Sequence, residues 1–129
     1  MIYVYNRNVE DFSMLENNYY IGRENILSNP YTHLPLKDTK AMFQCKTREE
    51  AIEKYDKYFD LMYGRNVEFT KVVDEMYEKY KNGEDLFLEC YCGKGENGEK
   101  KCHGEVIAEK LQKRLLKEKY EEYRRKKNK

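Results

Sequence analysis

The sequence predicts a small, single-domain α/β protein with a three- or four-stranded, mostly parallel sheet flanked by about three helices. Residues 1–6 and 86–92 alternate apolar and other side chains, as strands do. Three further segments carry apolar residues at helical spacing, and the inferred order is strand, strand, long loop, helix, helix, strand, helix. A helical crossover between strands favours parallel pairing through a right-handed connection. An antiparallel hairpin of the two N-terminal strands is the alternative.

The first strand is expected at Met1–Asn6 and the second at Tyr19–Ile21, directly before Gly22. Polar residues are scattered between them, and a brief helical turn is expected around Phe12. Residues 24–40 contain both prolines and little periodicity, which predicts a long loop. Long loops in compact domains are more often functional than idle.

The first helix is expected to begin after Thr47, which can cap it together with Glu50, and to end at Gly64. A second helix follows and closes at Asn82-Gly83, and a third starts at Gly104 or Glu105 and runs to about Arg125. Apolar residues at helical spacing on the first two helices are expected to form the core: Ile52, Tyr55, Phe59, Met62, Phe69, Val72, Val73, Met76 and Tyr80.

The composition of the 129 residues indicates one domain, residues 1–129, with a charged tail at about 120–129 that projects or frays. The formal net charge of +1 argues against nucleic acid as the partner of the whole protein, although basic residues close the chain. No apolar run approaches the ~20 residues that span a bilayer, and no signal peptide opens the sequence. We therefore expect no membrane contact and a cytoplasmic location, in the host cytoplasm if a phage encodes the protein.

Three cysteines and a histidine near the last helix could hold zinc, because Cys90, Cys92, Cys102 and His103 offer sulfur and nitrogen ligands. The spacing is poor for a structural zinc site, since such sites usually separate paired cysteines by two to four residues. We expect no cofactor and no metal, with Cys90 a small buried core residue. Zinc bound by these four residues is the alternative.

A reactive thiol is a second interpretation of the same region. Cys92, Cys102 and His103 are the candidate catalytic residues, because a thiol beside an imidazole and a helix N-terminus becomes a nucleophile. The sequence names no further residue that would orient such a pair.

A ligand site is the third interpretation, with Gly22, Arg23, Asn29, Cys102, His103 and Gly104 as its residues. Glycine lets a ligand approach the backbone, and arginine offers a planar fork for phosphate or carboxylate. If the second and third strands are parallel, Arg23 and the segment from Cys92 to His103 lie at the same carboxyl edge of the sheet. The last helix would then direct free N–H groups towards an anion there.

Several short motifs follow in order: Tyr20-Ile21-Gly22-Arg23, Asn29-Pro30-Tyr31, Thr47-Arg48-Glu49-Glu50-Ala51, Leu88-x-Cys90-x-Cys92 and Cys102-His103-Gly104. In this order they resemble a family of small phage and bacterial domains of unknown function. The resemblance covers roughly residues 19–113. It supports the fold and the location of the site, and it brings no settled activity.

The leading hypothesis is a domain that binds a small phosphate-bearing ligand, a nucleotide in particular. In a phage protein such a site would sequester a host defence signal. One alternative is an enzyme that acts on a nucleotide or its glycosidic bond through Cys92, Cys102 and His103. Another is an inhibitor or adaptor that binds a host protein through the charged helices and the basic tail.

Overall fold

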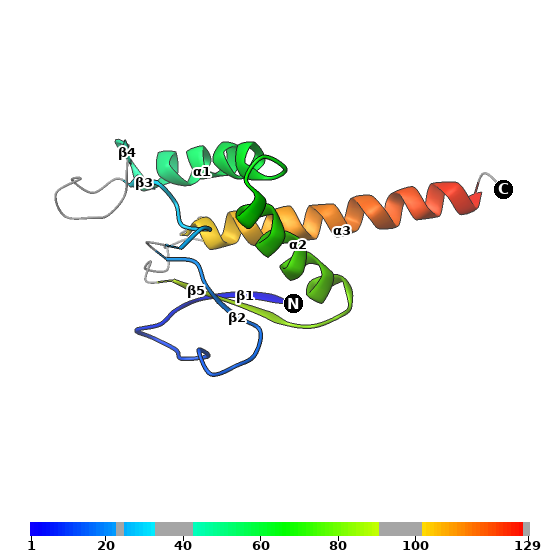
Figure 1. The fold of residues 1–129 in the computed structure, drawn as a ribbon, viewed down its shortest axis with the longest axis horizontal. Helices are drawn as coiled ribbons and strands as arrows, with labels where there is room; N and C mark the ends of the chain where they lie inside the picture. The colour runs from blue at the N-terminus through cyan, green and yellow to red at the C-terminus, as the bar shows by residue number, and fades with distance from the viewer. Residues whose placement is uncertain (23–24, 33–42, 91–101, 128–129) are drawn as a thin grey trace.

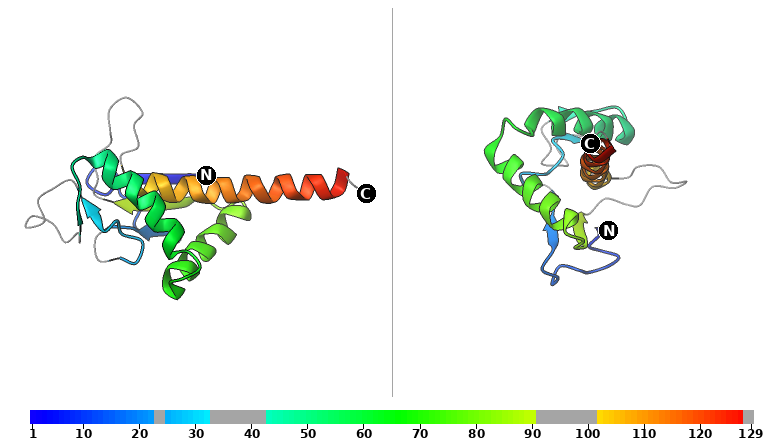
Figure 2. Two further views of the ribbon diagram at one scale, coloured as in Figure 1. Left: turned by 90° about the horizontal axis from the view of Figure 1, so that it is seen from above. Right: turned by 90° about the vertical axis from the view of Figure 1, so that its right-hand side faces the viewer.

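The structure is a computed structural model that describes residues 1–22, 25–32, 43–90 and 102–127 (Figure 1). It confirms a small α/β fold. Within the described residues the helices are α1 (Arg48–Met62), α2 (Val67–Lys81) and α3 (His103–Lys127). Helices α2 and α3 pack on one face of a three-stranded sheet, and α1 lies over α3 on the side away from the sheet (Figure 2).

The sheet consists of β1 (Ile2–Asn6), β2 (Asn18–Tyr20) and β5 (Leu86–Cys90) in the order β1-β5-β2. Both pairs are parallel, with Tyr3 opposite Phe87 and Tyr19 opposite Leu88. The antiparallel hairpin is therefore wrong, because the late strand β5 lies between the two early strands. All three carboxyl ends meet at one edge of the sheet.

The two faces of the sheet pack differently. Leu86, Leu88 and Cys90 point into the core formed with the helices. On the opposite face Phe87 contacts Phe12, whose ring centroid lies 5.2 Å away and which also packs on the rings of Tyr3 and Tyr5. Residues 7–17 form turns that hold Phe12 over this face, and the helical turn expected around Phe12 is absent from them.

The helices begin and end close to the predicted positions. Thr47 caps α1 by accepting a 3.1 Å hydrogen bond from the Glu50 amide, and Asn66 caps α2 in the same way from Phe69. The predicted inward residues pack in or against the core, and Tyr77 joins them as a fully buried residue that the spacing did not single out. Helix α3 begins slightly earlier than predicted, at His103.

Two very short strands lie where the sequence predicted only loop or made no prediction. β3 (Tyr31–Thr32) pairs in parallel with β4 (Phe43–Gln44), and β3 packs on α1. Two-residue strands have too few side chains to show an alternating pattern, so neither strand could be predicted from the sequence. The rest of the predicted loop, from residue 33, lies outside the described residues.

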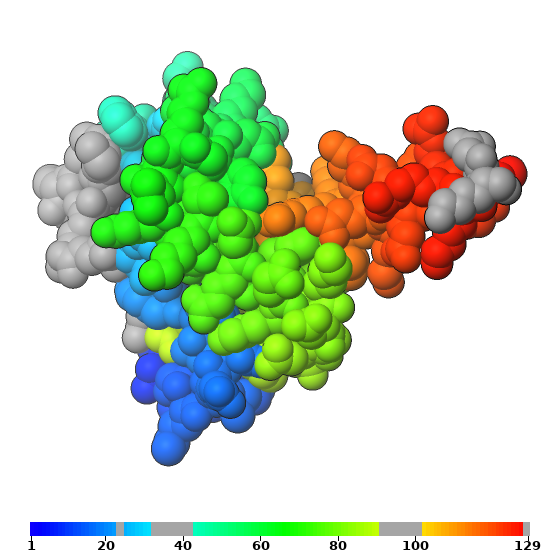
Figure 3. Space-filling view, turned by 45° about the vertical axis from the view of Figure 1, so that its right-hand side comes forward, coloured from blue at the N-terminus to red at the C-terminus, as the bar shows by residue number. Residues whose placement is uncertain are grey.

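The C-terminal half of α3 extends beyond the body of the protein (Figures 1 and 3). Leu115 still packs against the core, whereas all residues from Lys119 to Lys127 are exposed. No helix in the described part of the chain is long and apolar enough to cross a membrane.

Candidate functional site

The carboxyl edge of the sheet brings the ends of β2 and β5 together with the start of α3. The amide of Ile21 donates to the carbonyl oxygen of Glu89 at 3.0 Å, which extends the β2–β5 pairing to the residue before Gly22. The carbonyl oxygen of the same Ile21 lies 2.6 Å from Nε2 of His103. Gly22 and the Cys102–Gly104 segment are thus neighbours at this edge.

Cys102 caps the N-terminus of α3. Its Sγ accepts the amide of Gly104 at 3.4 Å, and its carbonyl oxygen accepts the amide of Glu105 at 3.0 Å. These amides would otherwise be unsatisfied at the first turn of a helix. The expectation that these amides are free to bind an anion is therefore wrong for Gly104 and Glu105, because Cys102 accepts both of their hydrogen bonds.

Cys102 and His103 form a thiol–imidazole pair. A carbonyl oxygen only accepts hydrogen bonds, so Nε2 of His103, which faces Ile21, carries hydrogen. Nδ1 of the same ring lies 3.6 Å from the Cys102 sulfur. It accepts from the thiol when the ring is neutral and donates to a thiolate when the ring is protonated.

This pair is buried. The exposed fraction is 4% for Cys102 and 5% for His103. The Tyr55 ring stands edge-on to the imidazole with the ring centroids 4.9 Å apart, and its hydroxyl donates to the Leu27 carbonyl oxygen at 2.7 Å. Burial raises the pKa of Tyr55 well above its usual value. Tyr55 therefore joins α1, the segment after Gly22 and the start of α3.

Gly104 allows α3 to approach the sheet closely. A Cβ atom at this position would lie 2.8 Å from Cδ1 of Ile21 and 2.8 Å from Cγ1 of Val4. Such distances are too short for carbon atoms in contact, so the side chains of Ile21 and Val4 or the helix itself would have to shift. The lack of a side chain at Gly104 therefore serves helix–sheet packing directly.

Gly104→Ala is expected to destabilise the protein by about 1–2 kcal/mol. Overpacking a core costs typically ~1–3 kcal/mol, and alanine regains up to ~1 kcal/mol of helix propensity. Denaturant unfolding followed by circular dichroism measures the difference. Gln112→Ala, at an exposed position of the same helix, is the control and should stay within ~0.5 kcal/mol. A Gly104→Ala protein as stable as the parent would contradict the packing argument.

Residues 4–113 match a protein family described as a domain of unknown function, DUF4326. The chain belongs to this family. The matched region runs from β1 into the middle of α3, so it includes the whole carboxyl edge and ends where α3 leaves the body of the protein. Neither curated proteins nor solved structures give a significant match.

Within this DUF4326 domain, the Asn29 side chain links two backbone segments next to the candidate site. Its side chain is buried, donates to the Ala51 carbonyl oxygen at 3.1 Å and accepts the Tyr31 amide at 3.0 Å. Both ends of the amide therefore bond to the backbone and tie the segment after β2 to the first turn of α1. Asn29 therefore holds the segment that follows β2 in a fixed position beside the candidate site.

Arg23 and Cys92 lie outside the described residues. Cys90 is buried, as predicted, with its sulfur 3.4 Å from the Tyr5 carbonyl oxygen. In the part of the chain that the structure describes, no group of three or more His, Cys, Asp or Glu residues could hold a metal ion. The alternative zinc site stays untested, because Cys92 belongs to it.

A buried carboxylate on the face of the DUF4326 sheet that Phe12 covers was missed as a candidate. Glu89 is 5% exposed, and its Oε1 accepts hydrogen bonds from the Tyr5 hydroxyl at 3.0 Å and the Asn18 amide at 3.2 Å. Arg7 forms an ion pair with the same oxygen at 3.6 Å. The signal in the sequence is a lone charge inside the apolar strand Leu86–Cys90. The cluster connects all three strands close to the carboxyl edge.

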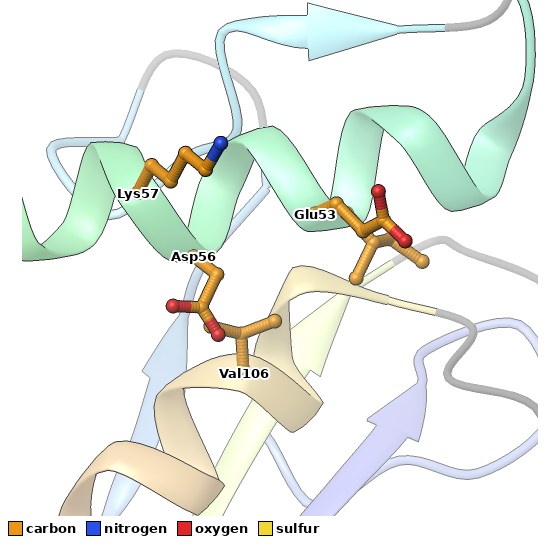
Figure 4. A pocket seen from close by; sticks show the side chains of 5 residues that line it. Glu53, Asp56, Lys57 and Val106 are labelled. Carbon is orange, nitrogen blue, oxygen red and sulfur yellow. The ribbon is translucent and has the colours of Figure 1, made fainter.

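An open pocket of about 290 Å³ adjoins the edge between α1 and the start of α3 (Figure 4). Val106 is three residues after His103, so it continues the same side of the helix into the pocket. Lys110 donates to Asp56 at 2.6 Å and keeps this carboxylate paired. The pocket is lined by Ile52, Glu53, Asp56, Lys57 and Val106.

Proposed function

We propose that this DUF4326 domain binds a small phosphate-bearing molecule, a nucleotide in particular, at the carboxyl edge of its sheet. The observation that carries the proposal is the convergence of three parallel carboxyl ends with the N-terminus of α3. In open α/β sheets, ligands bind outside the carboxyl ends of the strands. A helix N-terminus at that edge favours negative charge through its dipole.

Each edge residue has a distinct part in this proposal. Gly22 accommodates the Tyr20 ring, which lies where a side chain would stand, and Arg23, the next residue, supplies the charged fork for the phosphate. Cys102, His103 and Gly104 hold the N-terminus of α3 in place. Because Cys102 already accepts the amides of Gly104 and Glu105, the helix acts on the phosphate through its dipole. Asn29 holds the neighbouring segment in place.

The pocket between α1 and α3 supplies the part of the site for the nucleoside. The carboxylates of Glu53 and Asp56 accept hydrogen bonds from sugar hydroxyls, and Ile52 and Val106, both almost fully buried, add apolar lining. Acidic side chains repel phosphate, so the phosphate belongs at the edge and the sugar in the pocket. This division favours nucleotides over inorganic phosphate.

Binding fits the geometry better than catalysis does. Cys102 and His103 are nearly inaccessible to solvent and bond to each other and to the Ile21 carbonyl, which leaves them little access to a substrate. If the protein is phage-encoded, the site would serve to sequester a host signalling nucleotide.

The test is isothermal titration calorimetry and thermal shift with a panel of mononucleotides, dinucleotides and inorganic phosphate. Arg23→Ala is expected to weaken binding about 10- to 100-fold, because a charge-assisted hydrogen bond contributes ~1.5–3 kcal/mol. Arg65→Ala, an exposed arginine in the α1–α2 connection, removes the same charge and should bind as the parent does. No binding by any of these compounds, or equal binding by both variants, would refute the site.

A further inference from the structure

The part of α3 that projects from the domain has one face that carries cations, aromatic rings and Leu116, and no carboxylate. At about 100° per residue, the residues of this face fall within roughly 120° of the helix circumference. Glu118, Glu121 and Glu122, the carboxylates of this segment, all lie outside that arc. Leu116 lies within it. We call the face the cationic face and define it by Lys113, Lys117, Tyr120, Tyr123, Arg124 and Lys127.

The side chains of the cationic face are unpartnered in the described part of the chain. The ion pairs of this segment join Arg114 to Asp74 at 2.9 Å and to Glu118 at 3.8 Å, Glu118 to Lys81 at 3.2 Å, and Glu122 to Lys126 at 3.4 Å. None of them uses a residue of the face. Tyr120 is 61% exposed and Tyr123 is 60% exposed. Figure 3 shows this part of α3 standing clear of the rest of the protein.

Position in the chain separates this face from the nucleotide site. The family match ends at residue 113, where the cationic face begins. From Lys113 to Lys127 the helix extends by ~21 Å at 1.5 Å per residue. That length corresponds to about six nucleotides of one strand at a rise of 3.4 Å.

We propose that the cationic face binds single-stranded nucleic acid. Phosphates attract the lysines and the arginine, and no carboxylate on the face opposes them. The exposed tyrosine rings offer stacking surfaces to unpaired bases, and such stacking works for any base. The net charge of +1 for the whole chain conceals this local excess of positive charge, which lies on one side of one helix.

Other partners fit the face less well. An acidic protein would satisfy the cations and gain little from two exposed rings placed among them. A membrane surface needs a broad apolar face, and Leu116 is the aliphatic residue within this arc. Duplex nucleic acid would satisfy the charges but would hide its bases from the tyrosines.

The experiment is fluorescence anisotropy of the full chain with a short, labelled, mixed-sequence single-stranded RNA and with the corresponding duplex, over a series of salt concentrations. The single strand is expected to bind more tightly. Arg124→Gln/Lys127→Gln should lower the magnitude of the salt slope by about 1.4, since each contact on a single strand contributes ~0.7. Tyr120→Ala/Tyr123→Ala should weaken single-strand binding about tenfold or more and leave duplex binding unchanged.

The matched control is Lys119→Gln/Lys126→Gln, which removes the same charge from positions outside the arc. It should change binding much less than Arg124→Gln/Lys127→Gln does. Equal effects of the two charge pairs, or equal affinity for duplex and single strand with no effect of the tyrosines, would overturn the proposal. So would binding to anionic vesicles without binding to RNA.

Discussion

Tyr55→Ala is expected to lower the free energy of unfolding by about 3–5 kcal/mol, the usual cost of deleting a large buried aromatic side chain. Tyr55 is fully buried, packs edge-on to His103 and donates its hydroxyl to the Leu27 carbonyl oxygen at 2.7 Å. Its removal leaves a cavity where α1 meets the start of α3. Denaturant unfolding followed by circular dichroism measures the loss.

Tyr55→Phe separates the hydrogen bond from the packing. The ring stays in place, but the Leu27 carbonyl oxygen loses its donor in a buried position, which costs about 1–3 kcal/mol. Tyr58→Phe is the matched control on the same helix, because Tyr58 is only partly buried, and it should stay within ~0.5 kcal/mol. If Tyr55→Phe were as stable as the parent, the hydroxyl would have no role in fixing the edge.

The helical half of the fold could be read from the sequence because its signals are local. Thr47 and Glu50 mark the start of α1 within four residues, and the apolar spacing of both middle helices identifies the buried face. Parallel pairing followed from the helices between the strands, and the structure confirms it. These inferences need no knowledge of contacts between distant residues.

The contacts that build the site could not be predicted, because they join residues far apart in the chain. His103 bonds to the backbone of Ile21, 82 positions away, and Glu89 meets Tyr5 across 84 positions. Both contacts depend on β5 entering between β1 and β2, and no local pattern specifies that order. The sequence predicted one ligand site from Gly22 and Cys102–Gly104, which stays a prediction, and it missed that Cys102 caps α3.

The role of glycine shows the same limit. The sequence predicted Gly104 as the helix start of a ligand site, whereas its neighbours in the structure are the side chains of Ile21 and Val4. A glycine at the start of a helix gives the same sequence pattern whether it serves close packing or ligand access. Only the distance from the helix to the sheet distinguishes packing from ligand access.

Alkaline pH is expected to unfold the protein through its buried tyrosines. Burial and the hydrogen bond to the Glu89 carboxylate raise the pKa of Tyr5 to about 12, and burial raises the pKa of Tyr77 to about 12 as well. A pKa raised above the unfolded value of ~10 means that the fold favours the neutral phenol. The resulting stabilisation is complete below about pH 10 and is lost as the pH rises towards 12.

The expected loss is large. A shift of ~2 pKa units corresponds to ~2.7 kcal/mol, so the two tyrosines together account for up to about 5 kcal/mol between pH 10 and pH 12. The denaturant midpoint should fall steeply over this range, and phenolate absorbance should rise together with the loss of helical signal.

Tyr5→Phe tests the assignment. The variant starts less stable at neutral pH, because Glu89 loses a hydrogen-bond donor, but its stability should fall less than that of the parent between pH 10 and pH 12, by up to ~2.7 kcal/mol. Tyr120→Phe, at an exposed position, should follow the parent curve. Lysine deprotonation contributes equally to all three proteins, so the comparison isolates the phenol. An unchanged alkaline slope in Tyr5→Phe would show that Tyr5 ionises as freely in the folded protein as in the unfolded chain.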